Sequence, residues 1–307
     1  MTSPQTVEDY RRVCPGANAR VGGTRAREQG DAQGQPLISV VTAVRNRRET
    51  LSRTLDSVLG QSFRSVEHIV VDGASSDGTL DVLQAYGDRI ALWISEPDSG
   101  LFDAMNRGVS LSRGRYISIL NSDDWYDSKA IEAVAATIAA TQAEVVYGDH
   151  MFVVQDIGMQ KRIVATTDLY SGMTLGHAIF ASRSVYERLG LYDTRYGYSA
   201  DLDFALRMQK SGAKFAHVES GAPLLYFSSG GTAEAHLFRA SMEAADILRR
   251  RAGIWPGTVY GLKGMRRVLS RGVLGLYGAI MGEAAYRRAK GRYYQRAGYV
   301  ATEHIPH

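Results

Sequence analysis

The sequence predicts an α/β protein with a mixed, mostly parallel β-sheet and helices on both faces. Residues 37–44 (LISVVTAV) form a β-branched run, which is typical of a strand buried on both sides. Residues 49–61 repeat apolar side chains at helical spacing, and a second strand is expected at residues 66–71. Because strands and helices go on alternating at this spacing, the chain is expected to contain βαβ units.

The remaining elements follow from the same periodicities and from turn residues between them. Residues 151–167 alternate weakly and predict one or two antiparallel strands. Further strands are expected at residues 90–94, 115–120, 144–149, 178–181, 214–218 and 224–227. Further helices are expected at residues 79–86, 101–112, 128–141, 184–189, 200–210 and 234–251.

Composition indicates a soluble globular protein. The 307 residues are 45 % hydrophobic and 22 % charged, and the single Cys14 excludes a disulfide framework. No stretch reaches the roughly 18 uninterrupted apolar residues of a membrane span, and no signal-peptide core is visible, so we expect a cytoplasmic protein. Residues 1–35 are polar and lack apolar periodicity, which predicts a disordered N-terminal tail.

The positive charge is concentrated near the C-terminus. Residues 239–296 contain thirteen Lys and Arg but only three acidic residues, whereas the whole chain has a net charge of +4. We therefore expect residues 236–307 to form basic C-terminal helices that contact an anionic membrane surface. A solvated helical bundle packed on the rest of the protein is the alternative. No nucleic-acid motif accompanies the charge, so nucleic acid is not expected as a partner.

Carboxylates recur where strands end or helices begin. Asp72 closes one predicted strand, Asp123 and Asp124 follow another, and Asp201 lies in the first turn of a helix. Ligands of open α/β sheets bind beyond the carboxyl ends of the strands. Adjacent carboxylates there favour a hard divalent cation, Mg²⁺ or Mn²⁺. The alternative is that Asp123 and Asp124 are only a turn and a helix cap.

Several common nucleotide and hydrolase motifs are absent from the sequence. No GxGxxG follows the first strand, which argues against a dinucleotide site. No GxxxxGK[ST] loop is present, which argues against P-loop phosphate transfer. No GxSxG elbow supports a serine hydrolase.

Five partial motifs occur in a fixed order: VVTAVRN, VVDGASSDGT, SEPDSGLFDAMNRG, ISILNSDD and SADLDFALRM. In this order and spacing, residues 37–231 resemble a family 2 glycosyltransferase of the GT-A fold, of the type found in bacterial capsule, exopolysaccharide and glycolipid synthesis. The resemblance implies a catalytic domain at residues 36–235. It also implies a metal-dependent, inverting transfer of a sugar from a nucleotide-diphosphate donor, UDP being the expected nucleotide, to a saccharide or lipid-linked acceptor.

The resemblance further assigns donor contacts. Thr42 and Asn46 match the nucleoside contacts of the family, and Asp72 matches the residue that accepts the N3–H of uracil. Asp98 and Asn106 match contacts to the ribose and pyrophosphate. The resemblance assigns three more residues to substrate binding. Arg107 is expected as a counter-charge to the diphosphate, Asp124 is expected beside the metal position, and His177 is expected to face the sugar.

The same resemblance assigns the metal and the catalytic base. Asn121 and Asp123 occupy the family's DxD position, with Asn in place of the first Asp, so Asp123 is the expected direct ligand. Asp201 matches the acid that takes the acceptor's proton, and Asp203 is expected to orient or cap the same helix.

Two other classes of function remain open from the sequence. A catalytically silent polysaccharide- or partner-binding protein could use the same fold, although it would not need Asp72, Asp123 and Asp201 together. A nucleotidyltransferase could share a similar sheet, although that class usually has a Gly-rich basic loop after the first strand, and residues 43–48 contain no Gly.

Overall fold

The computed structural model describes residues 6–26, 34–167 and 178–302. Its larger sheet has the strand order β1-β4-β3-β2-β5-β10-β7-β11. Strands β4, β3, β2 and β5 run parallel, β1 and β10 pair antiparallel with their neighbours, and β11 is parallel to β7. The strands are β1 (Arg20–Gly22), β2 (Ile38–Val44), β3 (Val66–Asp72), β4 (Leu92–Ser95), β5 (Tyr116–Ile119), β7 (Val145–Tyr147), β10 (Ile179–Ser182) and β11 (Phe215–His217).

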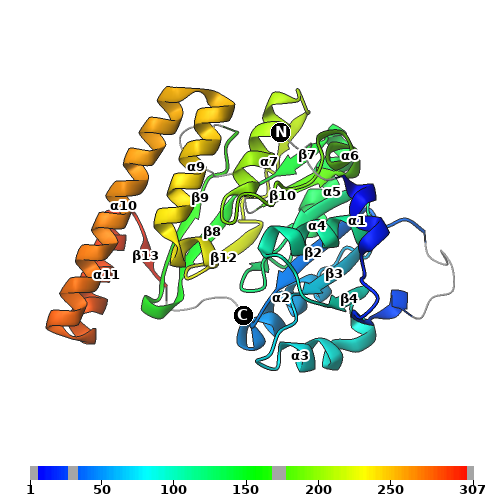
Figure 1. The fold of residues 1–307 in the computed structure, drawn as a ribbon, viewed down its shortest axis with the longest axis horizontal. Helices are drawn as coiled ribbons and strands as arrows, with labels where there is room; N and C mark the ends of the chain where they lie inside the picture. Colours follow the sequence, from blue (N-terminus) through cyan, green and yellow to red (C-terminus); the bar gives the residue numbers. More distant parts are fainter. Residues whose placement is uncertain (1–5, 27–33, 168–177, 303–307) are drawn as a thin grey trace.

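Helices cover both faces of this sheet, as the sequence predicts (Figure 1). In β2, Val41 and Ala43 pack in one core cluster with α4, whereas Val44 packs in another with α2 and α3. Both faces of β2 are therefore dry, which explains its unbroken apolar run. The helices are α2 (Arg48–Leu59), α3 (Thr79–Tyr86), α4 (Leu101–Leu111), α5 (Ala130–Thr141), α6 (Arg183–Leu189) and α7 (Ala200–Lys210).

A second sheet lies beside the first, and its strand order is β13-β9-β8-β12-β6. Its hairpin β8–β9 confirms the antiparallel strands expected within residues 151–167. The sequence analysis did not predict β6 or β13, which have only two residues each and pair with distant strands. The strands are β6 (Trp125–Tyr126), β8 (His150–Val154), β9 (Met159–Ile163), β12 (Leu225–Ser228) and β13 (Val300–Ala301).

The N-terminal segment is folded where the structure describes it, so the prediction of a disordered tail is wrong for residues 6–26. Helix α1 (Val7–Val13) packs on α4, and β1 extends the edge of the large sheet beside β4. The buried Tyr10 hydroxyl donates to Asp103 (2.8 Å), and the Arg25 guanidinium pairs with Glu67 (2.8 Å). These partners lie far away in the sequence, and local periodicity therefore could not reveal the segment.

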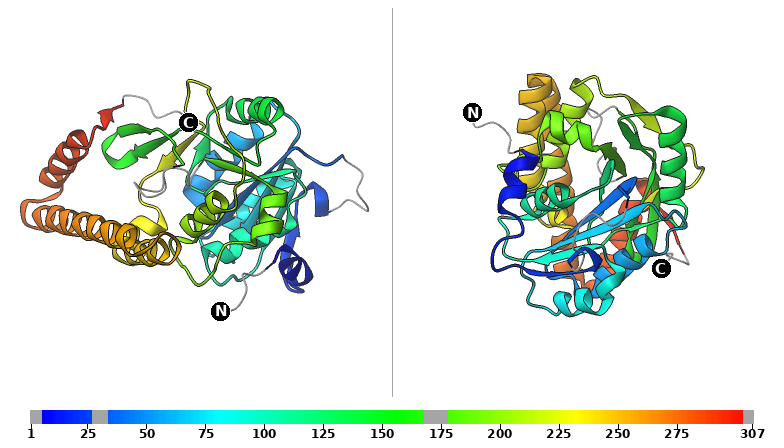
Figure 2. Two further views of the ribbon diagram at one scale, coloured as in Figure 1. Left: turned by 90° about the horizontal axis from the view of Figure 1, so that it is seen from above. Right: turned by 90° about the vertical axis from the view of Figure 1, so that its right-hand side faces the viewer.

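The C-terminal segment is helical, and it packs on the rest of the protein rather than forming a separate unit. Helix α9 (Leu237–Ala252) follows the short α8 (Thr232–Ala235), and its Ile247 and Leu248 are buried in the main core. Helix α10 (Ile254–Met281) then runs back along α9, and α11 (Glu283–Arg296) follows α10. Figures 1 and 2 show α10 and α11 along the edge of the molecule opposite α1. Among the residues described, no helix combines the length and the apolarity that crossing a membrane requires.

The packing of α1 gives a first testable prediction. Tyr10→Ala should lower the free energy of unfolding by about 3–5 kcal/mol, because it removes a buried aromatic ring and the hydrogen bond to Asp103. Urea denaturation of the full chain measures this. The exposed Arg12→Ala on the same helix is the control, expected within about 0.5 kcal/mol of the parent chain. Equal stability of both variants would show that the segment is not docked.

Candidate active site

Several of the predicted site residues follow strands that end at one edge of the large sheet. Strands β2, β3, β4 and β5 are parallel, so their carboxyl ends meet at the same edge. Asn46 follows β2, Asp72 ends β3, Asp98 follows β4, and the loop of residues 121–124 follows β5. Ligands of open α/β sheets bind at such an edge.

Asp72 is fully buried and fixed by the neighbouring strand. Its Oδ2 accepts hydrogen bonds from the Ser95 hydroxyl (2.7 Å) and from the Ser75 N–H (3.1 Å), and the Ser75 hydroxyl donates to Oδ1. Ser95 lies directly opposite Asp72 in the β3–β4 register. The carboxylate is thus held rigidly at the end of the sheet, and its bond to uracil stays a prediction.

The two residues assigned to the nucleoside differ in position. Thr42 is buried inside the sheet, and its Oγ1 lies 3.0 Å from Nε2 of His68 on the adjacent strand. Burial lowers the pKa of His68 to about 3, so this ring is neutral. Thr42 therefore lies inside the sheet, and its assignment as a nucleoside contact stays a prediction. Asn46 is exposed, and its Oδ1 accepts a hydrogen bond from the N–H of Ser76 (2.9 Å), which joins the loops after β2 and β3.

Helix α2 holds the loop that carries the predicted metal ligands. Thr50, Arg53 and Thr54 lie on one face of α2, and each donates to a main-chain carbonyl of residues 122–124, at 2.8, 3.1 and 2.7 Å respectively. The Arg53 guanidinium also lies 3.7 Å from the centre of the Trp125 ring. Three consecutive carbonyls are therefore fixed by one helical turn.

The two adjacent carboxylates in this loop have different environments. Asp124 is buried; its Oδ1 accepts from the Ser228 N–H (2.8 Å) and its Oδ2 from the Asn121 amide (3.0 Å). Burial and the neighbouring Asp123 raise the pKa of Asp124 well above its usual value. Asp124 thus holds the loop in this structure, and its assignment as a substrate contact stays a prediction. Burial also raises the pKa of Asp123, although the positive charges of Arg47 and Arg53 lower it in part.

Asp123 is the carboxylate available to a ligand. It is partly exposed, and apart from its own N–H no described residue donates a hydrogen bond to its side chain. Asn121 uses its amide nitrogen on Asp124, which leaves its carbonyl oxygen for another partner. Two such oxygens suit Mg²⁺ or Mn²⁺, but no group of three or more metal-binding side chains occurs in the described part of the chain. A metal here would take its remaining ligands from a diphosphate or water.

Asp201 lies in an apolar enclosure at the start of α7. Its Oδ1 accepts the N–H of Leu202 (2.9 Å). Burial raises the pKa of Asp201 to about 6, despite this hydrogen bond. A small cavity beside it is lined by Ile119, Ile179, Tyr186, Tyr192, Phe204 and Met208. A carboxylate with a pKa near neutral can accept a proton and release it again at physiological pH.

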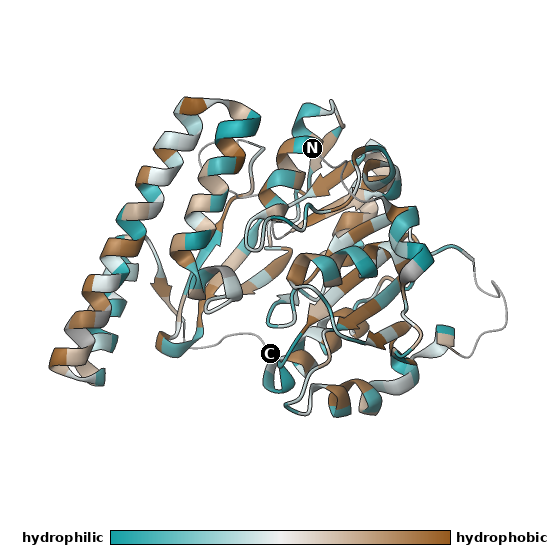
Figure 3. Ribbon diagram, in the orientation of Figure 1, coloured by the Kyte–Doolittle hydropathy of each residue, from teal (hydrophilic) through white to brown (hydrophobic). Residues whose placement is uncertain are grey.

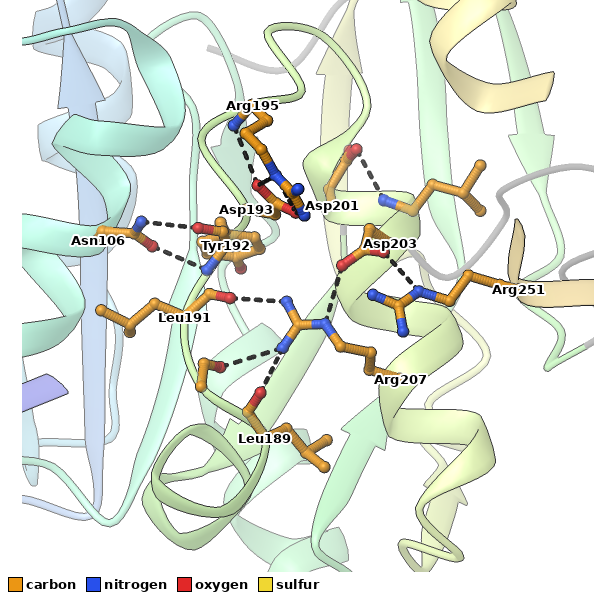
Figure 4. A network of polar contacts seen from close by, with 12 residues as sticks. Asn106, Leu189, Leu191, Tyr192, Asp193, Arg195, Asp201, Asp203, Arg207 and Arg251 are labelled. Atoms are coloured by element: carbon orange, nitrogen blue, oxygen red, sulfur yellow. Dashed lines mark hydrogen bonds and ion pairs between the residues drawn. The ribbon is translucent and has the colours of Figure 1, made fainter. Parts of the chain in front are cut away.

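The neighbouring Asp203 has a structural role. Figure 4 shows its carboxylate between Arg207 (2.8 Å) and Arg251 (2.7 Å), the second reaching over from α9. Arg207 also donates to the carbonyls of Leu189 and Leu191, both at 2.6 Å. Asp203 therefore fixes α7, α9 and the segment that leads to α7, in line with the expectation that it orients this region.

Asn106 and Arg107 also have structural partners. The Asn106 amide donates to the carbonyl of Tyr192 and accepts its N–H, both at 2.9 Å, and the residue is fully buried (Figure 4). Arg107 pairs with Glu96 (2.7 Å) and Asp103 (3.0 Å). Since both side chains are already satisfied, the structure does not place them as contacts to ribose or diphosphate.

Further cations lie near the acidic edge, and one predicted residue is not described. Burial raises the pKa of Asp98, and the charges of Arg107 and Arg45 oppose this rise. Burial likewise raises the pKa of Asp123, and the charges of Arg47 and Arg53 oppose it. Residues 45–48 therefore bring positive charge to the acidic edge. In the sequence, this positive charge is visible as the arginines directly after the first predicted strand. His177 lies outside the described residues.

This geometry defines an open α/β fold with acidic and cationic groups at the carboxyl edge of its sheet. The model of glycosyl transferase family 2 matches residues 39–179. A PGL/p-HBAD biosynthesis glycosyltransferase of Mycobacterium tuberculosis is 31 % identical over 192 residues, which cover 60 % of this chain and 75 % of the relative. The chain belongs to glycosyl transferase family 2.

Further comparisons agree with this assignment. The putative teichuronic acid biosynthesis glycosyltransferase TuaG of Bacillus subtilis is 40 % identical over 101 residues, or 32 % of this chain and 40 % of TuaG. TarS 1-349 of S. aureus, solved with UDP-GlcNAc, has a TM-score of 0.54 at 14 % identity and covers 76 % and 72 % of the two chains. The mannosyltransferase PcManGT of Pyrobaculum calidifontis, solved with GDP-Man and Mn²⁺, has a TM-score of 0.57 at 15 % identity. The match covers 89 % of this chain and 84 % of PcManGT. These structures confirm the GT-A fold.

The contrast between Asp123 and Asp124 gives a second prediction. Asp124→Ala should lower the free energy of unfolding by about 1–3 kcal/mol, because the buried Ser228 N–H and Asn121 amide lose their acceptor. Asp123→Ala, the matched control one residue away, should leave stability unchanged or slightly higher. Urea denaturation at neutral pH measures both. A larger loss for Asp123→Ala than for Asp124→Ala would contradict the assignment of their roles.

Proposed function

We propose that this glycosyltransferase transfers a sugar from a UDP-sugar to an acceptor hydroxyl with inversion at the anomeric carbon. The observation that carries the proposal is the pair of partly exposed carboxylates at the active-site edge: Asp123, to which no other described residue donates a hydrogen bond, and Asp201, with its pKa of about 6. Asp123 suits an electrostatic role toward a diphosphate, and Asp201 suits proton transfer.

In a single displacement, the acceptor oxygen bonds to the anomeric carbon as the bond to the diphosphate oxygen breaks, and UDP departs with the electron pair. Asp201 takes the proton that the hydroxyl loses. Asp72 would hold the uracil ring. Asp123 and Asn121 would hold Mg²⁺ or Mn²⁺, which when bound neutralises charge on the departing diphosphate. Arg45 and Arg47 add positive charge to the same edge.

The names of the relatives support a role in cell-surface synthesis. They refer to PGL/p-HBAD and to teichuronic acid biosynthesis, so we propose a saccharide or lipid-linked acceptor in glycolipid or polysaccharide synthesis. We expect the reaction at the cytoplasmic face of a bacterial membrane. A catalytically silent binding protein is less consistent with Asp201, because keeping a carboxylate with a raised pKa costs stability without serving binding.

The donor site gives a third prediction. Asp123→Ala should weaken UDP binding in the presence of Mn²⁺ at least tenfold, because the diphosphate charge is no longer compensated through this residue. Titration calorimetry with Mn²⁺, and again with a chelator, measures the change. Glu49→Ala, an exposed acid in the first turn of α2, is the control. Equal Mn²⁺-dependence in Asp123→Ala and the parent would place the metal elsewhere.

The catalytic base gives a fourth prediction. Asp201→Asn should reduce transfer by about 10²- to 10⁴-fold with little change in UDP binding, because the amide keeps the hydrogen bond to Leu202 but cannot take a proton. In the parent, kcat/KM should rise tenfold per pH unit up to about pH 6 and then level off, since only ionised Asp201 is active. The variant should lack this ascending limb.

Stability provides an independent check of the same pKa. Because the folded-state pKa of Asp201 is raised from 3.8 to about 6, its contribution to stability is fully present below pH 3.8 and is lost as the pH rises through 6. Asp201→Asn should therefore become more stable than the parent between pH 4 and 7 by an amount on the order of 1–3 kcal/mol. A stability difference that does not change with pH, together with normal transfer, would mean that the base is another residue, and Asp203→Asn would be tested next.

A further inference from the structure

Helix α10 packs on α9 through small residues on one face. A Cβ atom on Gly264 would lie 2.5 Å from the Cβ of Ser241, and one on Gly257 would lie 2.7 Å from the carbonyl oxygen of Ala245. Only glycine allows the two helices to approach this closely. The contact fixes which side of α10 faces the body of the protein, and its large side chains are therefore on the other side.

The outer face of α10 is an apolar stripe that nothing in the described structure covers. The stripe contains ten of the fifteen large hydrophobic side chains that are exposed in the described residues. Trp255 is 78 % exposed and Leu269 is 63 % exposed. Between the adjacent pairs at its two ends, the members recur every three or four residues along the helix (Figure 3), and they are Ile254, Trp255, Val259, Leu262, Met265, Leu269, Val273, Leu276, Ile280 and Met281. A 28-residue helix makes this stripe about 40 Å long.

The stripe is bordered by cations without acidic partners. Helix α10 contains no Asp or Glu, and Glu283 is the only acid of α11. Three of the basic residues are already paired, Arg271 with Glu234, Arg287 with Glu283 and Lys290 with Asp156. The remaining unpaired cations, as far as the structure is described, are Lys263, Arg266, Arg267, Arg288, Arg292 and Arg296.

Apolar and basic side chains meet in a groove between α10 and α11. The groove has a volume of about 850 Å³. Leu262, Leu269 and Val273 lie along it, together with Arg266 and Arg292. Helix α11 is held in place on its other side, where the buried Tyr294 packs with Val154 and Met159 of the β8–β9 hairpin. The groove is therefore part of the fold rather than a gap beside a loose helix.

We propose that the α10–α11 surface, defined by this stripe, groove and unpaired cations, docks the protein on an anionic phospholipid bilayer. An amphipathic helix with basic residues beside an apolar face lies in the headgroup region with that face toward the acyl chains. Each cation near such a surface strengthens binding roughly fivefold at modest salt. The inference stands on this surface alone and does not depend on the proposed transfer reaction.

The positive charge of the α10–α11 surface argues against a second copy of the chain as its binding partner. Two α10 stripes packed together would bring the unpaired cations of both copies side by side, with no acid on either α10 to compensate them. Like charges in such positions are destabilising. Anionic headgroups supply the missing negative charge, and the acyl boundary covers the apolar stripe.

Docking on this surface would also orient the active site. Arg251 at the end of α9 is bonded to the buried Asp203 of α7, the helix that carries Asp201. The α10–α11 surface and the proposed base are thus linked by packed helices rather than by a flexible linker. A lipid-linked acceptor would then be presented to the enzyme at a fixed height above the bilayer.

The test is co-sedimentation of the full chain with vesicles of phosphatidylcholine alone or mixed with phosphatidylglycerol. Binding should require phosphatidylglycerol and weaken with added salt. Arg266→Gln combined with Arg292→Gln should weaken it on the order of twentyfold. The matched control is Arg20→Gln with Arg64→Gln, two exposed cations of the catalytic body, and it should bind like the parent. Leu269→Ser with Val273→Ser should also weaken binding, at unchanged melting temperature.

Other outcomes would overturn the proposal. It fails if the parent does not bind, if binding ignores phosphatidylglycerol, or if the two arginine pairs behave alike. Dimerisation by analytical ultracentrifugation that Leu269→Ser with Val273→Ser abolishes, without vesicle binding by the parent, would assign the surface to a second copy. UDP binding measured on every variant separates this result from a failure of the proposed function, because the surface variants should keep it.

Discussion

The buried carboxylate of Asp203 is the contact on which the geometry around α7 depends. It is 1 % exposed and lies between two guanidinium groups from different parts of the chain. Removing one partner of such a buried pair typically costs about 3–5 kcal/mol, because a charge is left uncompensated in the interior. Through Arg207 it fixes the segment before α7, and through Arg251 it fixes α9. These two ion pairs therefore also fix the position of Asp201, which lies two residues away on the same helix.

The site uses neighbouring carboxylates in different ways, and burial decides which does what. Asp124 and Asp203 are enclosed and have their oxygens bonded to partners that hold the fold. Asp123 and Asp201 lie one or two residues away, are partly exposed, and have raised pKa values. Within each pair, the satisfied carboxylate fixes the backbone from which the available one extends. The rigidity needed for a preorganised site is therefore built beside the groups that meet the substrate.

The sequence predicted most of the regular elements and the identity of the edge, because both depend on local patterns. Helix α3 and helix α7 fall on the predicted residues, and the parallel strands that precede the predicted acids end at one edge. What the sequence did not reveal depends on distant partners. Asn106 satisfies the main chain of Tyr192, which is 86 residues away, and Tyr10 bonds to Asp103, 93 residues away. A motif identifies such residues as recurrent, but only the fold shows whether a side chain faces a ligand or the interior.

The same reasoning explains why the C-terminal helices act as part of the catalytic body. A basic segment with an apolar face could have been a tethered tail, and its position relative to the site would then be averaged over many conformations. Instead α9 is buried in the main core, glycine contacts fix α10 on α9, and Tyr294 anchors α11 on the second sheet. Each joint is a close-packed contact with one geometry. Any surface that α10 and α11 bind is therefore held at a defined orientation to the carboxyl edge where Asp123 and Asp201 lie.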